Sequence, residues 1–208
     1  AMRRIWGSTA DYLPLQGAHA MLGRAAKLVE PSADLQSDAP NLIASMLAAG
    51  YDKDAARWIG AVSQMDDEYA DRAWAMLALG APDGSGVNVG VGRINDFIDR
   101  DASEGKKRSA LLVAGLAGLG RIDQETASRL SSRHGLRVGN RTQWTRVIDR
   151  AAALGQSGTV LVLTGTGLQA ATLAEIPPAH VFHSVAALKR TGQEYTARMI
   201  AAEALART

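Results

Sequence analysis

The chain has 208 residues, of which 47% are hydrophobic and 21% charged, and its formal net charge is +2. This size suits one medium domain or a repeat array with a sizeable core, and the composition excludes a disordered chain. Cysteine is absent, which excludes disulfides, thiolate metal sites and cysteine nucleophiles. No apolar run reaches about 18 residues, so we expect no membrane span. Residues 1–2 are expected to be a tag remnant.

Charge is unevenly distributed along the chain. Residues 30–104 carry 14 acidic and five basic residues, whereas residues 105–150 carry ten basic and three acidic residues. Such blocks create a strong local electrostatic field even though the net charge of the chain is small. They are either solvated helix faces or, in 105–150, a surface for an anionic partner or for the acidic face of another copy.

Alanine, with 38 residues, and the helical spacing of apolar residues predict an all-α protein. Asp38 and Asn140 are expected N-caps, and Asp67 and Glu68 place acids at the positive end of a helix dipole. In chain order, the expected helices are 16–29, 40–49, 52–64, 67–79, 88–100, 105–119, 123–134, 140–154, 157–172, 178–191 and 193–206.

Glycines predict where several helices end. Gly50, Gly80, Gly120, Gly155 and Gly192 each follow an Ala- or Leu-rich segment and are expected C-caps, because glycine enters the left-handed region at low cost. The last three are separated by 35 and 37 residues, and the first and third by 70, twice that period. A single hairpin cannot bury its apolar stripe, so we expect a right-handed α-solenoid of about five antiparallel hairpins and about 11 helices.

The turn residues of two hairpins share a pattern. The last hairpin has Gly192 in its turn, Ala197 five residues later and Ala204 a further seven residues on, and Gly50 and Ala55 repeat the first step. This pattern resembles the tetratricopeptide repeat, whose period is 34 residues. The family's tryptophan and Leu-Gly pair are absent. The resemblance implies a scaffold that binds proteins or peptides, with no chemistry of its own.

The expected domain organisation follows from this period. Residues 3–39 are an N-terminal cap or the end of a preceding repeat, and residues 40–208 are the helical-repeat domain. Its units are 40–64, 67–101, 105–134, 140–172 and 178–208.

One segment has the form of a nucleotide-binding turn. An apolar run from Thr159 leads into Gly165, Gly167 and Ala170, which match G-x-G-x-x-A. No second strand pattern is evident, and no acid lies about 20 residues further on. The repeat phase favours the alternative, in which this segment is a helix and both glycines are close-packing positions. The glycine-rich stretch Gly84–Gly92 lacks the end of a phosphate loop, and we expect a long inter-helix connection.

For the other residues with potential chemistry, an ordinary structural role explains the pattern better than a catalytic or metal-binding role. His180 and His183 have ligand-compatible spacing, but no third ligand accompanies them. Ser103 and Lys106 match Ser-x-x-Lys without the partner motifs of acyl-transfer enzymes. The carboxylates of 52–71 lie mostly at helix starts, where capping explains them. No catalytic, cofactor-binding or metal residue is therefore predicted, and no cofactor is expected.

The sequence predicts a binding surface in the basic stretch. Four tryptophans have the helical spacing of core residues, but Trp144 lies among arginines, a composition typical of interfaces. The candidate partner-binding residues are Arg129, Arg133, Arg137, Arg141, Trp144, Arg146 and Arg150.

The leading hypothesis is a non-catalytic protein–protein interaction or scaffold module, the C-terminal part of a larger bacterial protein of the cytoplasm or periplasm. The high alanine content and 18 arginines against five lysines indicate a GC-rich source. One alternative is binding of nucleic acid or another anionic polymer through the 129–150 face. A second is a carbohydrate-active, muramidase-like helical enzyme. Homo-oligomers through the acidic and basic faces are also possible.

Overall fold

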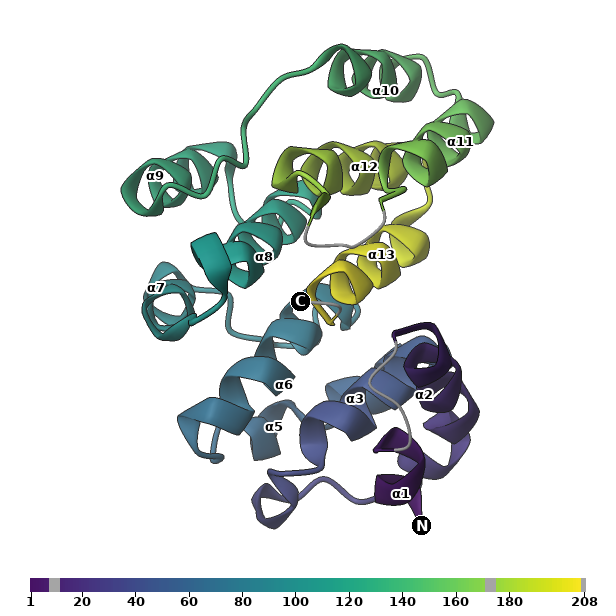
Figure 1. The fold of residues 1–208 in the computed structure, drawn as a ribbon, viewed down its shortest axis with the longest axis vertical. Coiled ribbons are helices and arrows are strands. Elements are labelled where there is room, and N and C mark those ends of the chain that lie inside the picture. Colours follow the sequence, from purple (N-terminus) through teal and green to yellow (C-terminus); the bar gives the residue numbers. More distant parts are fainter. Residues whose placement is uncertain (8–11, 171–174, 207–208) are drawn as a thin grey trace. The chain divides into compact units, whose positions relative to one another are not determined.

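The computed structural model describes residues 1–7, 12–170 and 175–206, and every element within these ranges is a helix (Figure 1). The all-α prediction is therefore confirmed for the described chain. The residues form two compact units, Ala1–Asn88 (unit 1) and Val89–Thr208 (unit 2). Across these ranges, no helix has the length and apolar character needed to cross a membrane.

Unit 1 is built around α3. Its helices are α1 (Met2–Trp6), α2 (Tyr12–Ala26), the 3-10 helix η1 (Ala33–Leu35), α3 (Ala39–Ala48), α4 (Asp52–Ala56), α5 (Ile59–Val62) and α6 (Asp67–Gly80). Helix α3 packs against α2, α4 and α6, and its Leu42, Ile43 and Met46 are almost completely buried. The indole of Trp6 donates a hydrogen bond to Ser45 Oγ at 3.2 Å. The N-terminal helices therefore share one core with α3.

Two expectations in unit 1 are wrong, and a third is confirmed in part. The helix expected over 52–64 is two short helices, because Arg57 and Trp58 donate to carbonyls three residues back and the chain turns there. Gly80 is helical, and it serves close packing because an added Cβ would lie 2.8 Å from Leu47. Asp38 is the N-cap residue of α3, as predicted, but its side chain makes no cap hydrogen bond, because both carboxylate oxygens accept hydrogen bonds from Arg3.

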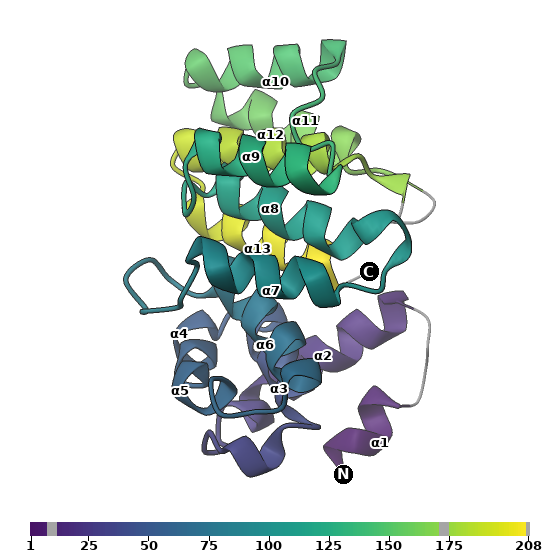
Figure 2. The ribbon, with the colours of Figure 1, turned by 90° about the vertical axis from the view of Figure 1, so that its left-hand side faces the viewer.

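Unit 2 is built around α12. Its helices are α7 (Val91–Arg100), η2 (Glu104–Lys106), α8 (Lys107–Gly118), α9 (Gln124–His134), α10 (Gln143–Ala153), α11 (Ser157–Gly167), α12 (Pro178–Arg190) and α13 (Glu194–Ala206). Helix α12 packs against α8, α10, α11 and α13, and it lies between α10 and α8 (Figure 2). In a sequential stack α10 would lie beside α8, and here α12 takes that place. Gly118 permits the close approach, because an added Cβ would lie 2.9 Å from Val185.

The glycine turns are largely as predicted. Gly50, Gly120, Gly155 and Gly192 all have positive φ, between 67° and 82°. Other helix ends in unit 2 differ from prediction by a few residues. Helix α7 begins at Val91 instead of 88, and α11 ends at Gly167 instead of 172; residues 171 and 172 lie outside the described ranges.

The cap of α10 differs from the expected Asn140. Thr142 accepts a hydrogen bond from the Thr145 backbone N–H, and Thr145 Oγ1 accepts one from the Thr142 N–H. This reciprocal pair is a capping box made by two threonines. Helix α10 therefore starts at Gln143, and Asn140 precedes the cap by two residues.

Candidate interaction surface

The basic stretch is divided between two helices. Helix α9 packs on α8, whereas α10 packs on α11 and α12, and an extended segment connects the two (Figure 1). Asp123 caps α9 by accepting a hydrogen bond from the Thr126 N–H at 2.6 Å. That bond holds the pKa of the Asp123 carboxyl below its usual value. Arg129 and Arg133 therefore lie on α9, Arg146 and Arg150 lie on α10, and Arg137 and Arg141 lie on the segment between these helices.

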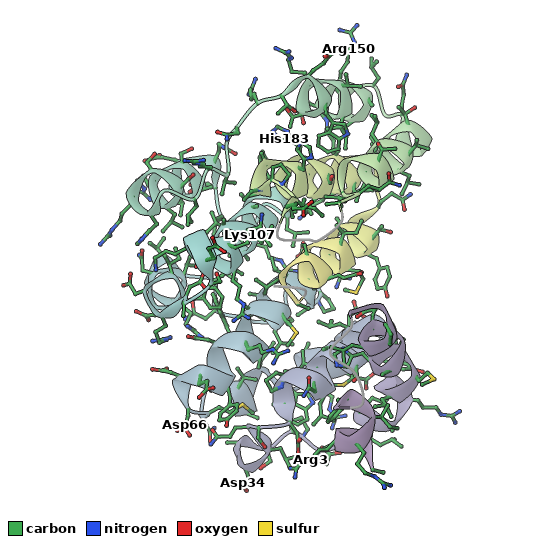
Figure 3. All side chains as sticks on the ribbon, in the orientation of Figure 1. Arg3, Asp34, Asp66, Lys107, Arg150 and His183 are labelled. Atoms are coloured by element: carbon green, nitrogen blue, oxygen red, sulfur yellow. The ribbon has the colours of Figure 1, made fainter. Side chains whose placement is uncertain are left out.

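All six predicted arginines are exposed, and we call them the arginine surface. Arg129 donates to Thr126 Oγ1 at 3.1 Å and lies 3.7 Å from Glu125. Within the described ranges, no ion pair or side-chain hydrogen bond holds the other five. These five are Arg133, Arg137, Arg141, Arg146 and Arg150. In Figure 3, Arg150 points outward from α10, away from α12. These five arginines therefore present positive charge that no carboxylate within the described ranges offsets by an ion pair.

The lysines of the same basic block have a different role. Lys106 donates to the carbonyl of Ile98 at 2.6 Å, and Lys107 donates to the carbonyl of Ile176. Ile98 lies in the last turn of α7, and Ile176 lies two residues before α12 begins. Carbonyls near helix ends are available to side-chain donors. Burial lowers the pKa of the Lys107 ammonium. Both lysines thus bind backbone carbonyls of unit 2, whereas the six arginines of the arginine surface are exposed.

Trp144 is half-buried and faces the interior of unit 2. Its indole N–H donates to the carbonyl of Leu163 at 3.2 Å, and its ring centroid lies 4.3 Å from that of His180. Gly167 contacts the ring closely, because an added Cβ would lie 2.8 Å from Trp144 Cη2 and nearer still to two other ring carbons. The structure therefore separates Trp144 from the arginines, which are exposed. Trp6, Trp58 and Trp74 are buried, as predicted for core residues.

The segment with the nucleotide-binding pattern is helix α11, so the strand–turn interpretation is wrong. The preferred helical alternative is confirmed, although only one of its glycines packs closely. Gly167 contacts Trp144, whereas an added Cβ at Gly165 would meet no atom within 4 Å. The stretch 84–92 is likewise a connection up to Gly90, followed by the start of α7.

The two histidines of α12 are oriented by different partners. His183 Nδ1 lies 2.7 Å from Asp149 Oδ1, between α10 and α12, and His180 Nδ1 lies 2.9 Å from the carbonyl of Gly167 (Figure 3). In the described part of the chain, no three His, Cys, Asp or Glu side chains are grouped as a metal site requires. The contacts of both histidines join α12 to the α10–α11 hairpin.

Ser103 and Lys106 are also turned toward the backbone. Ser103 Oγ accepts a hydrogen bond from the Arg108 N–H at 3.1 Å, and the Lys106 ammonium donates one to the Ile98 carbonyl. Beside them, Asp101 accepts hydrogen bonds from the Ser103 N–H and from both the N–H and Oγ of Ser109. Burial opposes ionisation of Asp101, but these serine hydrogen bonds hold its pKa below the usual value. A general acid for glycoside cleavage needs the opposite shift.

The carboxylates of 52–71 are distributed over helix starts and loops. Asp67 and Glu68 lie in the first turn of α6, as predicted. Asp66, the residue before that turn, makes no side-chain cap, because its carboxylate accepts a hydrogen bond from the Gln36 amide at 2.7 Å. Gln36 also accepts from the Asp66 N–H at 2.9 Å, so the pair joins two loops of unit 1.

The hairpin of α10 and α11 exposes aliphatic side chains that the sequence reasoning missed. Val147 is 47% exposed, Leu154 62%, Leu161 43% and Val162 67%. A signal for the last three exists in the sequence, because residues 151–174 contain no charged residue.

Comparisons with protein-family models, with curated proteins and with solved structures find no match for this chain.

Proposed function

We propose that this chain is a non-catalytic protein-binding module and that the arginine surface recognises an acidic partner. The observation that carries the proposal is the group of exposed guanidinium groups without an ion pair in the described residues. Guanidinium groups bind carboxylates through two parallel hydrogen bonds, and arginine is enriched at protein interfaces. The side chains with potential chemistry are instead engaged with the backbone or with neighbouring helices, as His180 and Lys106 are.

The proposed scaffold is a tetratricopeptide-like helical repeat. Its support is the set of left-handed glycines at the ends of helices, together with the packing of α10–α11 on α12–α13 in sequence order. The position of α12 beside α8 departs from a sequential stack. We therefore propose repeat-type stacking for the last two hairpins and a local rearrangement where α8 joins them.

Charge reversal tests the proposed surface. Arg141→Glu, Arg146→Glu and Arg150→Glu are introduced together, and partners recovered from a lysate of the source cells are quantified by mass spectrometry. Reversal replaces attraction of carboxylates by repulsion, so recovery of acidic partners is expected to fall. The matched control reverses Arg4, Arg24 and Arg190, which are also exposed. Unchanged recovery with the first triple variant would refute the proposal.

The same uncompensated arginines support a second candidate, binding of a nucleic acid or another anionic polymer. Phosphate binding releases counterions, so the logarithm of affinity falls with the logarithm of salt by about 0.7 to 0.9 per phosphate contact. A titration of fluorescent single-stranded DNA at several salt concentrations distinguishes the two. The protein-binding proposal expects no DNA binding at physiological salt, whereas tight binding with a steep salt slope would favour the second candidate.

A further inference from the structure

Helix α11 has an open apolar face. Gly158, Leu161, Val162 and Gly165 follow the i, i+3, i+4, i+7 spacing of one helical face, and all four are exposed. An added Cβ at either glycine would meet no atom within 4 Å, so nothing in the described structure covers this face. We call these four residues the α11 stripe. Soluble proteins usually bury such a stripe against another element.

The stripe has the relief that a second helix requires. Its two glycines lie about two turns apart and carry no side chain, so the helix backbone is open before Leu161 and after Val162. Packed helices insert the side-chain ridges of one into the grooves of the other, and glycine lets their axes approach closely. A fluid lipid surface does not need such gaps between side chains, because it has no ridges to insert into them. The relief therefore favours a helix as the occupant.

The charge on the neighbouring helix α10 indicates the chemistry of that second helix. On α10, which packs against α11, Val147 and Arg150 lie three residues apart on one helical face, and both are exposed, as is Leu154 at the C-cap. Arg146 is exposed one residue before Val147. The one acid of α10, Asp149, is paired with His183, and α11 carries no charge. The exposed charges of the α10–α11 hairpin are thus positive, and they accompany exposed apolar side chains.

We infer that the α10–α11 hairpin binds an amphipathic helix whose apolar face packs on the α11 stripe and whose carboxylates pair with Arg146 and Arg150. This inference rests on the proposed function and specifies its partner. A second copy of the same hairpin is disfavoured, because a two-fold contact would bring identical arginines together. The partner is accordingly a helix with apolar residues at i, i+3, i+4 and i+7 and a flank of Asp or Glu.

Selection from a display library tests the inference. The full chain is used to select from randomised helical peptides of about 16 residues, which is about four turns. Enriched peptides are expected to carry the apolar spacing above and a net negative charge. The affinity of the best peptide is then measured by fluorescence anisotropy against the wild type and point variants. Circular dichroism confirms that each variant keeps its helix content.

Two variants address the two halves of the interface. Val162→Asp places a charge on the stripe and is expected to lower the affinity for the peptide by about tenfold or more, as loss of a central contact does. The matched control is Met21→Asp, at a residue that is 76% exposed in α2. Arg150→Glu is expected to lower the affinity for the acidic peptide by a similar factor. This variant is expected to bind more tightly to a peptide with Lys in place of Glu. Rescue by this charge swap requires direct pairing.

Several outcomes would overturn the inference. Enriched peptides without acids would do so, as would an affinity that Val162→Asp leaves unchanged. Binding to vesicles containing phosphatidylglycerol, with no peptide enriched, would identify a lipid surface instead. A dimer in sedimentation that Val162→Asp dissociates would identify a second copy. If the triple arginine reversal abolishes recovery of the native partner while Val162→Asp does not, the proposed function stands and only the inference fails.

Discussion

Two glycines of α11 provide a direct test of the packing around Trp144. Gly165 and Gly167 are two residues apart in one helix, but their surroundings are opposite. An added Cβ at Gly165 would meet no atom within 4 Å, whereas at Gly167 it would overlap the indole of Trp144. The same substitution, Gly→Ala, is therefore expected to stabilise the protein at one position and destabilise it at the other.

The magnitudes follow from the contacts. Replacing a glycine inside a helix by alanine is favourable by about 0.5–1 kcal/mol, which is the gain in unfolding free energy expected for Gly165→Ala. At Gly167 the ring of Trp144 must move, although it is held by its bond to Leu163 and by His180. Overpacking costs about 1–3 kcal/mol and a lost hydrogen bond about 1 kcal/mol. Gly167→Ala is thus expected to lower the unfolding free energy by about 1–3 kcal/mol.

Urea unfolding followed by far-ultraviolet circular dichroism measures both effects. A double-mutant cycle with Trp144→Ala isolates the contact, because removing the indole is expected to abolish most of the penalty of Gly167→Ala. The fluorescence of Trp144 adds a local probe, since it is the one tryptophan of unit 2. Equal stability of the two alanine variants, or a penalty that persists without the indole, would refute the proposed packing.

Three further predictions concern buried or capping groups. Burial and the nearby Arg72 lower the pKa of His19 below 6.5. As the pH is lowered, the unfolded chain therefore binds a proton at His19 at a higher pH than the folded chain does. The melting temperature of the protein should fall as the pH is lowered from about 7.5 to 5, and His19→Gln should flatten this dependence. Asp101→Asn should cost about 1–3 kcal/mol at neutral pH. Folding lowers the pKa of Asp101, so its carboxylate stabilises the wild type less as the pH falls below 3.8. The difference in unfolding free energy between wild type and Asp101→Asn, measured by urea titration, should therefore shrink below this pH. Thr142→Ala should cost about 1 kcal/mol by removing a cap, whereas Asn140→Ala should change the unfolding free energy by less than about 0.5 kcal/mol; equal losses would contradict the cap at Thr142.

The candidate site was only partly predictable. Its arginines were predicted because a block with ten basic and only three acidic residues is visible along the chain. The role of Trp144 was not, since its ring contacts Gly167 and His180, which are 23 and 36 residues away in the sequence. The α11 stripe also depends on tertiary packing, because an uncharged helix is equally compatible with complete burial.

The sequence by itself determined that the chain is helical and where many helices end. Helix propensity and the left-handed glycine turn are local properties, so Gly50, Gly120, Gly155 and Gly192 were recognisable without any neighbour. The tertiary structure alone decided which helices are neighbours. Helix α12 lies beside α8 because Gly118 leaves space for Val185, a fit between residues far apart in the chain. The same packing buries one side of α11 and leaves its stripe exposed, because helices α10 and α12 cover only part of its surface.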